Sequence, residues 1–386
     1  MISLYPITSG LHAEAAANPG EERFILDIEN ELGENFSISE SFDGFGKNGL
    51  SLIYVRTGGT ESIFKTLDPD GPIYLLTSGK SNSLAASMEI LSYLHRNGRE
   101  GEIIHGTARK IAGRIKEIMT GQEPAGLGGE GGSAFIRPLP AVDLSGQKAG
   151  VIGTPSDWLI SSDVDYSKAK EKFGLRLVDI PMEELLDEMK SFRGDTRSFD
   201  GSVAIYEALK RIVERHSLTA LTIRCFDLLD TLHNTGCLAL ARLNSEGISA
   251  SCEGDIPALI SMMIAHRLTG CPGFQCNLSR IDGDELLFAH CTVPLTMVSS
   301  YKYATHFESG LGTAIKGEIK TGPATVFKVS PDLESMVSLP CRIERNENES
   351  NLCRTQIVVN CPGAENYFLR SSLANHHIIV PGEIVF

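Results

Sequence analysis

The sequence predicts two Rossmann-like α/β domains followed by a C-terminal all-β, barrel-like domain. In the first three quarters of the chain, short apolar runs typical of buried strands alternate with segments of helical periodicity. After about residue 290, short β-type runs are separated by Gly, Pro, Asn and Asp, as in a sandwich or barrel. The chain has 386 residues, enough for two or three domains that each bury a core. The predicted domains are residues 1–140, 141–290 and 291–386.

The first predicted domain repeats a strand and helix unit. An apolar strand at 73–76 precedes a helix at 82–96, in which Leu84, Met88 and Leu91 share one face. Further strands and helices of this domain are expected at 51–56, 102–105 and 108–119.

A glycine-rich segment, residues 121–132, is predicted to link the first two domains. Its stretch 126–131 matches a dinucleotide fingerprint as a string, but no apolar strand precedes it and no helix pattern follows, so we predict no nicotinamide site there. The second domain is expected to contain strands at 149–152, 175–180 and 221–225 and a helix at 182–190.

The predicted β domain has no helical period of convincing length. Its strands are expected at 312–316, 324–329, 342–344, 355–359 and 378–380.

Composition limits the classes of partner. A net charge of −14 argues against nucleic acid and anionic membrane surfaces, which need a cationic face. The N-terminus lacks the pattern of a secretory signal, and no apolar run approaches the roughly 18 residues of a membrane span. All nine cysteines lie between Cys225 and Cys361 without a C-x-x-C pair, which favours buried thiols in a reducing compartment. We therefore expect a cytoplasmic protein.

Three candidate metal-binding or proton-transfer residues, Glu253, Asn277 and His290, each come directly after a short apolar run with the pattern of a buried strand. Ligands of open α/β sheets bind at the carboxyl ends of the strands, so these side chains are expected to share one cleft. The three runs are residues 248–252, 273–276 and 286–289.

A carboxylate just before a helix is often a cap, so Glu253 and Asp255 have to be distinguished. Asp255 precedes Ile-Pro, and proline is tolerated in the first helical turn, which makes Asp255 the better N-cap and leaves Glu253 free for chemistry. Two other residues have structural interpretations: Glu61 as a cap of the helix that it begins, and Trp158 as a core residue.

Imidazole groups are available at His290 and at the pair His376 and His377. Neighbouring residues of a strand point to opposite faces, so at most one of this pair should enter the pocket. We favour His376, with His377 as a close alternative.

Other polar residues are candidates for binding. Arg224 ends a predicted strand and is predicted to hold a substrate oxygen, with an ion pair to Asp227 as the alternative. Glu308, in the predicted loop 306–310, is best placed to supply a second carboxylate. Lys80 and the first amides of the next helix are candidates for holding a substrate phosphate or carboxylate, with helix capping as the alternative.

Several motifs resemble the L-fucose isomerase and L-arabinose isomerase superfamily, most closely its short fucose-isomerase-like branch, and the resemblance covers most of the chain. The motifs are Thr57-Gly58-Gly59-Thr60-Glu61, Asn82-Ser83-Leu84-Ala85-Ala86, Pro155-Ser156-Asp157-Trp158-Leu159, Arg224-Cys225-Phe226-Asp227, Thr235-Gly236-Cys237, Cys252-Glu253-Gly254-Asp255, His290-Cys291-Thr292 and Asn375-His376-His377.

The resemblance implies an aldose–ketose isomerase that works through a cis-enediol, with a divalent ion, usually Mn²⁺, holding O1 and O2 of the sugar. Glu253 then matches one of the family's two acid–base carboxylates, and His290 and His376 or His377 match its imidazole groups. The resemblance also implies a homo-trimer or homo-hexamer, in which the first domain of a neighbouring subunit completes each site.

The family's second carboxylate aligns with Asn277. An amide is not a proton acceptor at neutral pH and is a weaker metal ligand than a carboxylate. Three outcomes are open: Asp282 or Glu308 replaces the missing carboxylate, the reaction is a different one such as an epimerase or lyase step, or the protein binds a sugar or metabolite without turnover. With Glu253 as the only anionic ligand, a divalent ion leaves the site positive, which favours an acidic or phosphorylated sugar.

We therefore expect a metal-dependent sugar isomerase-like enzyme. Its predicted site comprises the catalytic residues Glu253, Asn277 and Glu308, the metal ligands Glu253, His290 and His376, and the substrate-binding residues Arg224, Asp255 and His377.

Overall fold

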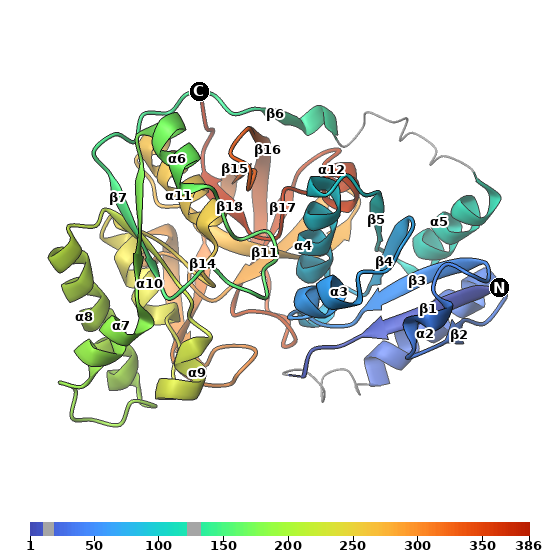
Figure 1. Cartoon of the computed structure of the whole chain (residues 1–386), viewed down its shortest axis with the longest axis horizontal. Coiled ribbons are helices and arrows are strands. Elements are labelled where there is room, and N and C mark those ends of the chain that lie inside the picture. The colour runs from blue at the N-terminus through green and yellow to red at the C-terminus, as the bar shows by residue number, and fades with distance from the viewer. Residues whose placement is uncertain (11–18, 122–132) are drawn as a thin grey trace.

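The computed structural model describes residues 1–10, 19–121 and 133–386. It contains two parallel sheets flanked by helices and one closed antiparallel sheet (Figure 1). These sheets confirm the predicted change from α/β to β structure along the chain. The predicted linker lies outside the described residues from position 122 onward, as does the fingerprint string at 126–131.

The first sheet has the strand order β2-β1-β3-β4-β5, and all of its pairings are parallel. Its strands are β1 (Ile2–Ile7), β2 (Ser37–Ile38), β3 (Leu50–Val55), β4 (Ile73–Thr77) and β5 (Gly101–Ile104). The helices of this unit are α2 (Pro19–Leu32), α3 (Glu61–Leu67), α4 (Ser83–Arg96) and α5 (Ala108–Thr120). Helix α4 is buried along most of its length because it packs on the first sheet and also on strand β11 of the closed sheet.

The second sheet has the order β10-β9-β7-β8 and is also parallel. Its strands are β7 (Lys148–Ile152), β8 (Arg176–Ile180), β9 (Ala220–Ile223) and β10 (Ser249–Ser251). The helices of this unit are α6 (Tyr166–Phe173), α7 (Met182–Met189), α8 (Phe199–His216), α9 (Asp227–Leu232), α10 (Cys237–Ser245) and α11 (Ile256–Thr269).

The third sheet closes on itself in the order β15-β18-β11-β12-β17-β16, because β15 also pairs with β16. Its strands are β11 (Phe274–Asp282), β12 (Glu285–His290), β15 (Gly322–Val329), β16 (Ser335–Asn346), β17 (Thr355–Asn360) and β18 (His377–Pro381). Strand β6 (Ile136–Pro138) extends this sheet at β16, β13 (Val298–Ala304) and β14 (Ala314–Ile319) form a separate hairpin, and α12 (Glu365–Arg370) precedes β18. Short 3-10 helices occur at Phe42–Gly44, Lys80–Asn82, Ser133–Phe135 and Leu295–Met297.

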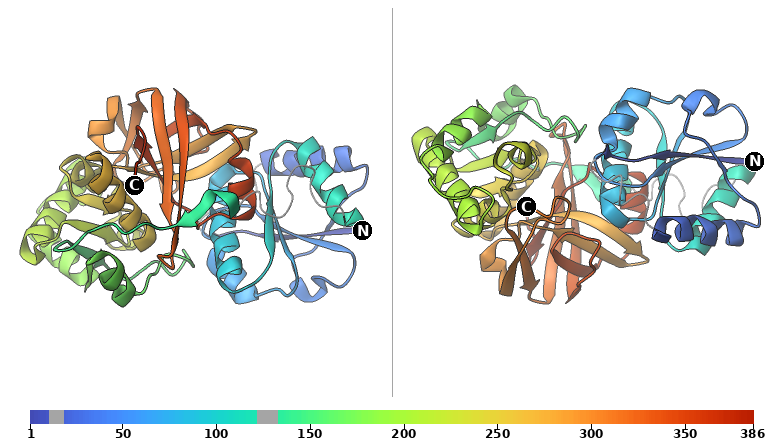
Figure 2. Two further views of the ribbon diagram at one scale, coloured as in Figure 1. Left: turned by 90° about the horizontal axis from the view of Figure 1, so that it is seen from above. Right: turned by 90° about the horizontal axis from the view of Figure 1, so that it is seen from below.

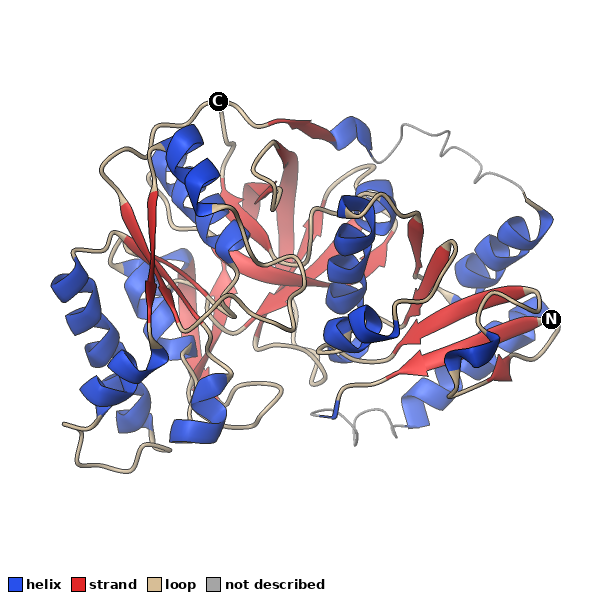
Figure 3. Cartoon of the chain, viewed as in Figure 1, coloured by secondary structure: helices blue, strands red, loops and turns tan. Residues whose placement is uncertain are grey.

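The closed sheet lies between the two α/β units, as the views along two directions show (Figures 1 and 2). Most helices belong to the two outer units, whereas the centre of the molecule consists of strands (Figure 3). Helix α11 joins the second unit to the centre, since it contacts β9 and β10 on one side and β15 and β18 on the other. Among the described residues, none of the helices is long and apolar enough to cross a membrane.

The structure differs from the sequence analysis in where antiparallel pairing begins. Strand β11 pairs with β12 and β18, so Asn277 and His290 lie on strands of the closed sheet and not on the parallel sheet that carries Glu253. Asn277 also lies within β11, not after its end. The reason is that Phe274, Cys276 and Leu278 alternate with polar residues that are buried too, so the strand continues through its polar positions. The division into three domains at residues 140 and 290 stays a prediction.

Candidate functional site

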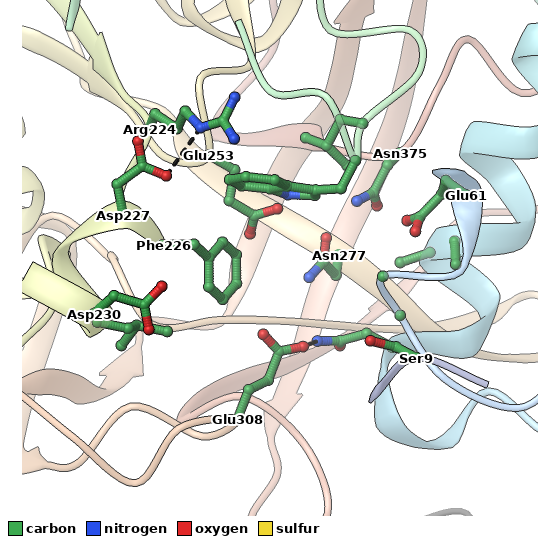
Figure 4. A pocket seen from close by; sticks show the side chains of 18 residues that line it. Ser9, Glu61, Arg224, Phe226, Asp227, Asp230, Glu253, Asn277, Glu308 and Asn375 are labelled. Atoms are coloured by element: carbon green, nitrogen blue, oxygen red, sulfur yellow. Dashed lines mark hydrogen bonds and ion pairs between the residues drawn. The ribbon is translucent and has the colours of Figure 1, made fainter. Parts of the chain in front are cut away.

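Four of the eight predicted site residues, Arg224, Glu253, Asn277 and Glu308, line one pocket, and both α/β units and the closed sheet contribute to its walls (Figure 4). The lining residues are Ser9, Gly58, Gly59, Glu61, Asn82, Ala85, Ala86, Trp158, Leu159, Arg224, Phe226, Asp227, Leu229, Asp230, Glu253, Asn277, Glu308 and Asn375.

Glu253 occupies the tight turn between β10 and α11. Its φ of +62° is in the left-handed region, and Gly254 follows at +64°. For a residue with a Cβ such a conformation costs about 1 to 3 kcal/mol and is common at functional sites. A Cβ at Gly254 would lie only 2.9 Å from the Ser156 backbone nitrogen, so the close approach requires glycine. The backbone therefore holds Glu253 in a fixed direction.

Two further contacts anchor this turn. The Cys252 N–H donates to Gln275 Oε1 on β11 (2.7 Å), which connects the end of β10 to the closed sheet. After the turn, Asp255 Oδ1 accepts from the Ala258 N–H (2.7 Å), so Asp255 is the N-cap of α11. Capping is thus carried out by Asp255, and the Glu253 carboxylate reaches the pocket.

Two imidazoles converge on the Glu253 carboxylate. His290 Nε2 lies 3.7 Å and His376 Nε2 lies 3.6 Å from Glu253 Oε1. On the opposite ring nitrogens, His290 Nδ1 contacts Thr292 Oγ1 (2.9 Å) and His376 Nδ1 contacts Asp255 Oδ2 (2.8 Å). His376 Nε2 is buried and has no hydrogen-bond partner among the described residues. A carboxylate oxygen and two ring nitrogens therefore point at one region.

A buried charge network lies behind His376. Lys328 is fully buried, and its Nζ is 3.6 Å from Asp255 Oδ2. The Glu89 carboxylate, also buried, accepts from the Ser161 N–H (2.5 Å) and the Asn375 N–H (3.0 Å). The Asp255 carboxylate thus has three kinds of partner: a helix N-terminus, an imidazole and an ammonium group.

Charge within this group shifts its pKa values. Burial lowers the pKa of His376, but the charge of Glu253 and the hydrogen bond to Asp255 outweigh burial and raise it to about 10. Burial raises the pKa of Glu253, yet the neighbouring His376 and His290 hold it well below its usual range. Glu253 is therefore an anion at neutral pH.

The first unit of the same chain forms the opposite wall of the pocket. Asn82 Nδ2 donates to Glu308 Oε1 (2.6 Å), which connects the start of α4 to the loop between β13 and β14. Glu61, the first residue of α3, is buried, and its Oε2 has no hydrogen-bond partner among the described residues. In this fold a single chain brings Glu61 and Asn82 to the pocket that contains Glu253, and Glu61 lies across the pocket from Glu253 (Figure 4).

Among the described residues that line the pocket, Arg224 is the one Lys or Arg. Its guanidinium pairs with Asp157 (2.9 Å) and Asp227 (2.9 Å), and lies 4.9 Å from the centre of the Trp158 ring. Trp158 in turn meets Phe226 edge to face at 5.2 Å. Arg224 therefore belongs both to the expected ion pair with Asp227 and to the pocket wall.

The remaining predicted site residues differ in their positions. Asn277 lines the pocket, and its buried Oδ1 has no hydrogen-bond partner among the described residues. His377 is fully buried away from Glu253, where its Nε2 contacts the Tyr367 hydroxyl (2.8 Å). Asp282 ends β11 and is not among the residues that line the pocket. Of the two carboxylates considered as replacements, Glu308 is the one in the pocket.

Sequence reasoning missed Glu61 and Trp158 as pocket residues, because it interpreted them as a helix cap and a core residue. A usable signal existed for Glu61. It follows β3 through a glycine-rich turn, and the carboxyl ends of parallel strands form the ligand-binding edge of such sheets.

The donor set fits a divalent metal ion. The two Nε2 atoms each lie within 3.7 Å of Glu253 Oε1, and the orphaned Nε2 of His376 is the kind of buried atom that a ligand satisfies. Ligand atoms of Cys252, Glu253 and His290 also lie within 4.8 Å of one another. The Cys252 Sγ, however, is 3.2 Å from Cys225 Sγ. Without Cys252 the candidate donor set is one carboxylate oxygen and two imidazole nitrogens.

The fold and the site together define a class of protein with two parallel α/β units and a closed sheet. Its pocket is lined by carboxyl groups and by the rings of Trp158 and Phe226, and a candidate metal centre lies beside it. Three known relatives are sulfoquinovose isomerases. The one from Clostridium sp. (strain MSTE9) is 26% identical over 218 residues, 50% of this chain and 47% of the relative. Those from Priestia aryabhattai and Priestia megaterium are each 26% identical over 215 residues, 48% of both chains.

The chain thus spans about half the length of the curated relatives that it matches. No family model matches the sequence. The similarity to these isomerases supports the superfamily of L-fucose and L-arabinose isomerases, and the short fucose-isomerase-like branch stays a prediction.

Proposed function

We propose that this chain is a metal-dependent sugar isomerase that interconverts an aldose and a ketose and acts on an acidic sugar. The observation that carries the proposal is the convergence of Glu253 Oε1 with the Nε2 atoms of His290 and His376 beside a polar pocket. The similarity to sulfoquinovose isomerases supports the reaction and an acidic substrate.

Glu253, His290 and His376 would hold the metal, with Mn²⁺ as the proposed ion. When bound, such an ion supplies a Lewis acid that acidifies a sugar hydroxyl and stabilises an enediolate. Asp255 fixes the ring of His376 through Nδ1, as carboxylates behind ligating histidines do. We infer that Asp255 and His377, which the sequence analysis assigned to substrate binding, act by positioning, since both lie behind the pocket wall.

Glu253 is the proposed general base that removes a hydrogen from a carbon atom of the sugar. Its charge at neutral pH and its fixed turn meet two requirements of a general base, which are the correct protonation state and a defined direction. Glu308 is the proposed second carboxylate, oriented by the Asn82 amide. Asn277 occupies the position at which the resemblance implies a second carboxylate, and its amide is proposed to form a hydrogen bond with a sugar hydroxyl.

Arg224 is proposed to bind the acidic group of the sugar. A sulfonate or carboxylate has oxygens that a guanidinium contacts in pairs, and the rings of Trp158 and Phe226 provide an apolar surface for the C–H face of a sugar.

The test is an isomerase assay of the purified chain with sulfoquinovose, with glucose as its neutral counterpart and with further aldoses and their phosphates, each with Mn²⁺ and with a chelator. We expect Mn²⁺-dependent turnover of an acidic sugar, and loss of at least about 100-fold in Glu253→Gln. Turnover that survives both the chelator and this substitution would contradict the proposal. Binding of an acidic sugar without turnover would instead favour a non-catalytic sugar-binding protein.

A further inference from the structure

Glu61 is a buried carboxyl group in the wall of the pocket. Its side chain belongs to a residue only 3% exposed, yet it contributes to the pocket surface together with Glu253 and Glu308. Its Oε2 has no hydrogen-bond partner among the residues that the structure describes. Burying such an oxygen without a partner costs free energy, and a ligand in the pocket would supply the missing contact.

A structural role does not explain this position. The N-cap of α3 is Thr60, whose hydroxyl donates to the Thr57 carbonyl (2.9 Å) and makes no cap to the helix. Glu61 comes one residue later, inside the first turn. No ion pair of Glu61 is found among the described residues, whereas Glu102, the largely buried carboxylate on β5, pairs with Arg114 and Arg370.

The electrostatic surroundings of Glu61 favour its neutral form. Carboxylates face it from three other parts of the fold: Glu89 on α4, Glu253 after β10 and Glu308 in the loop after β13. Burial is the largest effect, and together with these like charges it outweighs a hydrogen bond from the Glu61 backbone N–H and raises the pKa of Glu61 to about 8. At neutral pH Glu61 is therefore mostly a carboxylic acid, in a pocket that it shares with the carboxyl group of Glu253, and such pairs often divide the acid and base roles in enzymes.

We infer that Glu61 is a further catalytic carboxyl group, in addition to Glu253 and Glu308, and that it exchanges a proton with the sugar's O1 and O2 while Glu253 moves the hydrogen between C2 and C1. The inference rests on the proposed isomerase function. It assigns a role in proton transfer to Glu61, which the sequence analysis interpreted as a helix cap.

The proposed step balances. Glu253 takes the proton from C2, the C2–H electrons form the C1=C2 bond, and the C1=O1 π electrons take the proton of Glu61, which gives an enediol and a Glu61 carboxylate. The carboxylate then takes the O2 proton, C2=O2 forms, and the C1=C2 electrons take the proton from Glu253 at C1. Both residues return to their starting states, and no external oxidant or reductant is needed.

The test compares the wild type with Glu61→Gln, Glu61→Asp and the control Glu102→Gln, all loaded with Mn²⁺. Glutamine keeps the shape and can donate a hydrogen bond but cannot exchange a proton. We expect kcat to fall about 100-fold or more in Glu61→Gln with KM within about threefold, and about tenfold in Glu61→Asp. Glu102→Gln removes a carboxylate of the same unit outside the pocket and should stay within about twofold.

Two readouts do not depend on turnover alone. In infrared difference spectra across pH 6 to 10, the wild type and Glu102→Gln should show a carboxylic-acid C=O band lost with a midpoint near pH 8, and Glu61→Gln should lack it. This band should shift when sugar binds. The alkaline limb of the kcat profile should have the same midpoint in the wild type and disappear in Glu61→Gln.

The outcomes separate the two proposals. If the wild type is active and Glu61→Gln is equally active, the role of Glu61 is overturned while the proposed function stands. The same holds if the wild type lacks the C=O band. A chain that neither binds nor converts any sugar overturns the proposed function, and the role of Glu61 with it. A folded Glu61→Gln with raised KM and unchanged kcat would show that Glu61 only binds the sugar, which also contradicts the inference.

Discussion

Asn277 is a neutral amide in the pocket at the position where the resemblance to the isomerase superfamily implies a carboxylate, and the effect of adding a charge there depends on whether metal is present. Adding a carboxylate there by Asn277→Asp buries a second anion near Glu253 and should lower the melting temperature of the metal-free protein. With Mn²⁺ the new carboxylate becomes a ligand, so metal affinity should rise on the order of tenfold. Turnover of neutral aldoses should rise if the missing carboxylate alone limits isomerase activity, so turnover of neutral and acidic sugars is measured together with calorimetric metal titration.

Matched melting curves with a chelator and with Mn²⁺ complete this test. Tight Mn²⁺ binding by the wild type that Asn277→Asp leaves unchanged would show that another carboxylate, such as Glu308, already fills the role.

The raised pKa of Glu61 also affects stability. A carboxyl group whose pKa rises from 4.5 to about 8 on folding stabilises the native state below pH 4.5, and this contribution is lost as the pH rises to 8. Glu61→Gln cannot ionise, so it should melt higher than the wild type at pH 9, by roughly 5 °C, with the difference shrinking toward pH 5. Scanning calorimetry at these two pH values measures this, and a pH-independent difference would contradict the shifted pKa.

Substitution of Arg224 tests whether this residue binds the acidic group of the substrate. Its partners Asp157 and Asp227 are 74% and 36% exposed, so Arg224→Gln leaves no deeply buried charge and should cost little stability. We expect KM for an acidic sugar to rise about tenfold or more, with that of a neutral sugar changing less than about twofold. Arg211→Gln, which removes an exposed arginine paired with Glu188, is the control. An equal effect on both sugars would rule out Arg224 as the anion-binding residue.

At the scale of elements, strand β15 brings a charge to the start of α11. Lys328, near the end of β15, is fully buried and faces Asp255, the cap of that helix. Lys328→Met would leave the buried carboxylates of Asp255 and Glu89 with less compensation, so the free energy of unfolding should fall by about 3 kcal/mol. Urea denaturation measures this loss, and Lys320→Met in the exposed turn after β14 should change stability by less than about 0.5 kcal/mol. Unchanged stability in Lys328→Met would show that Lys328 does not compensate these carboxylates.

At the scale of the whole molecule, the described residues of one chain already bring both α/β units and the closed sheet to the pocket. The homo-trimer or homo-hexamer stays a prediction, but a neighbouring first domain is not needed to bring Glu61 and Asn82 to Glu253. Specific activity should therefore stay constant within about twofold when dilution dissociates an oligomer, as followed by sedimentation velocity and assays over the same concentrations. Activity that falls in step with dissociation would show that a neighbouring chain completes the site.

The sequence by itself determined the local features of this protein. Alternating apolar periods predicted the two α/β units, and short runs after residue 290 predicted β15, β17 and β18. The Ile-Pro pair after Asp255 separated the helix cap from Glu253. These predictions succeed because strand alternation, helix periodicity and capping depend on residues within a few positions of one another.

Only the tertiary structure decided which of these residues meet. It placed β11 in the closed sheet between β12 and β18, and it brought His376, not His377, beside Glu253. It also turned Glu61 from an expected cap into a pocket residue with a raised pKa. The physical reason is that strand pairing, burial and the field of distant carboxylates depend on residues far apart in sequence, so no local pattern contains them.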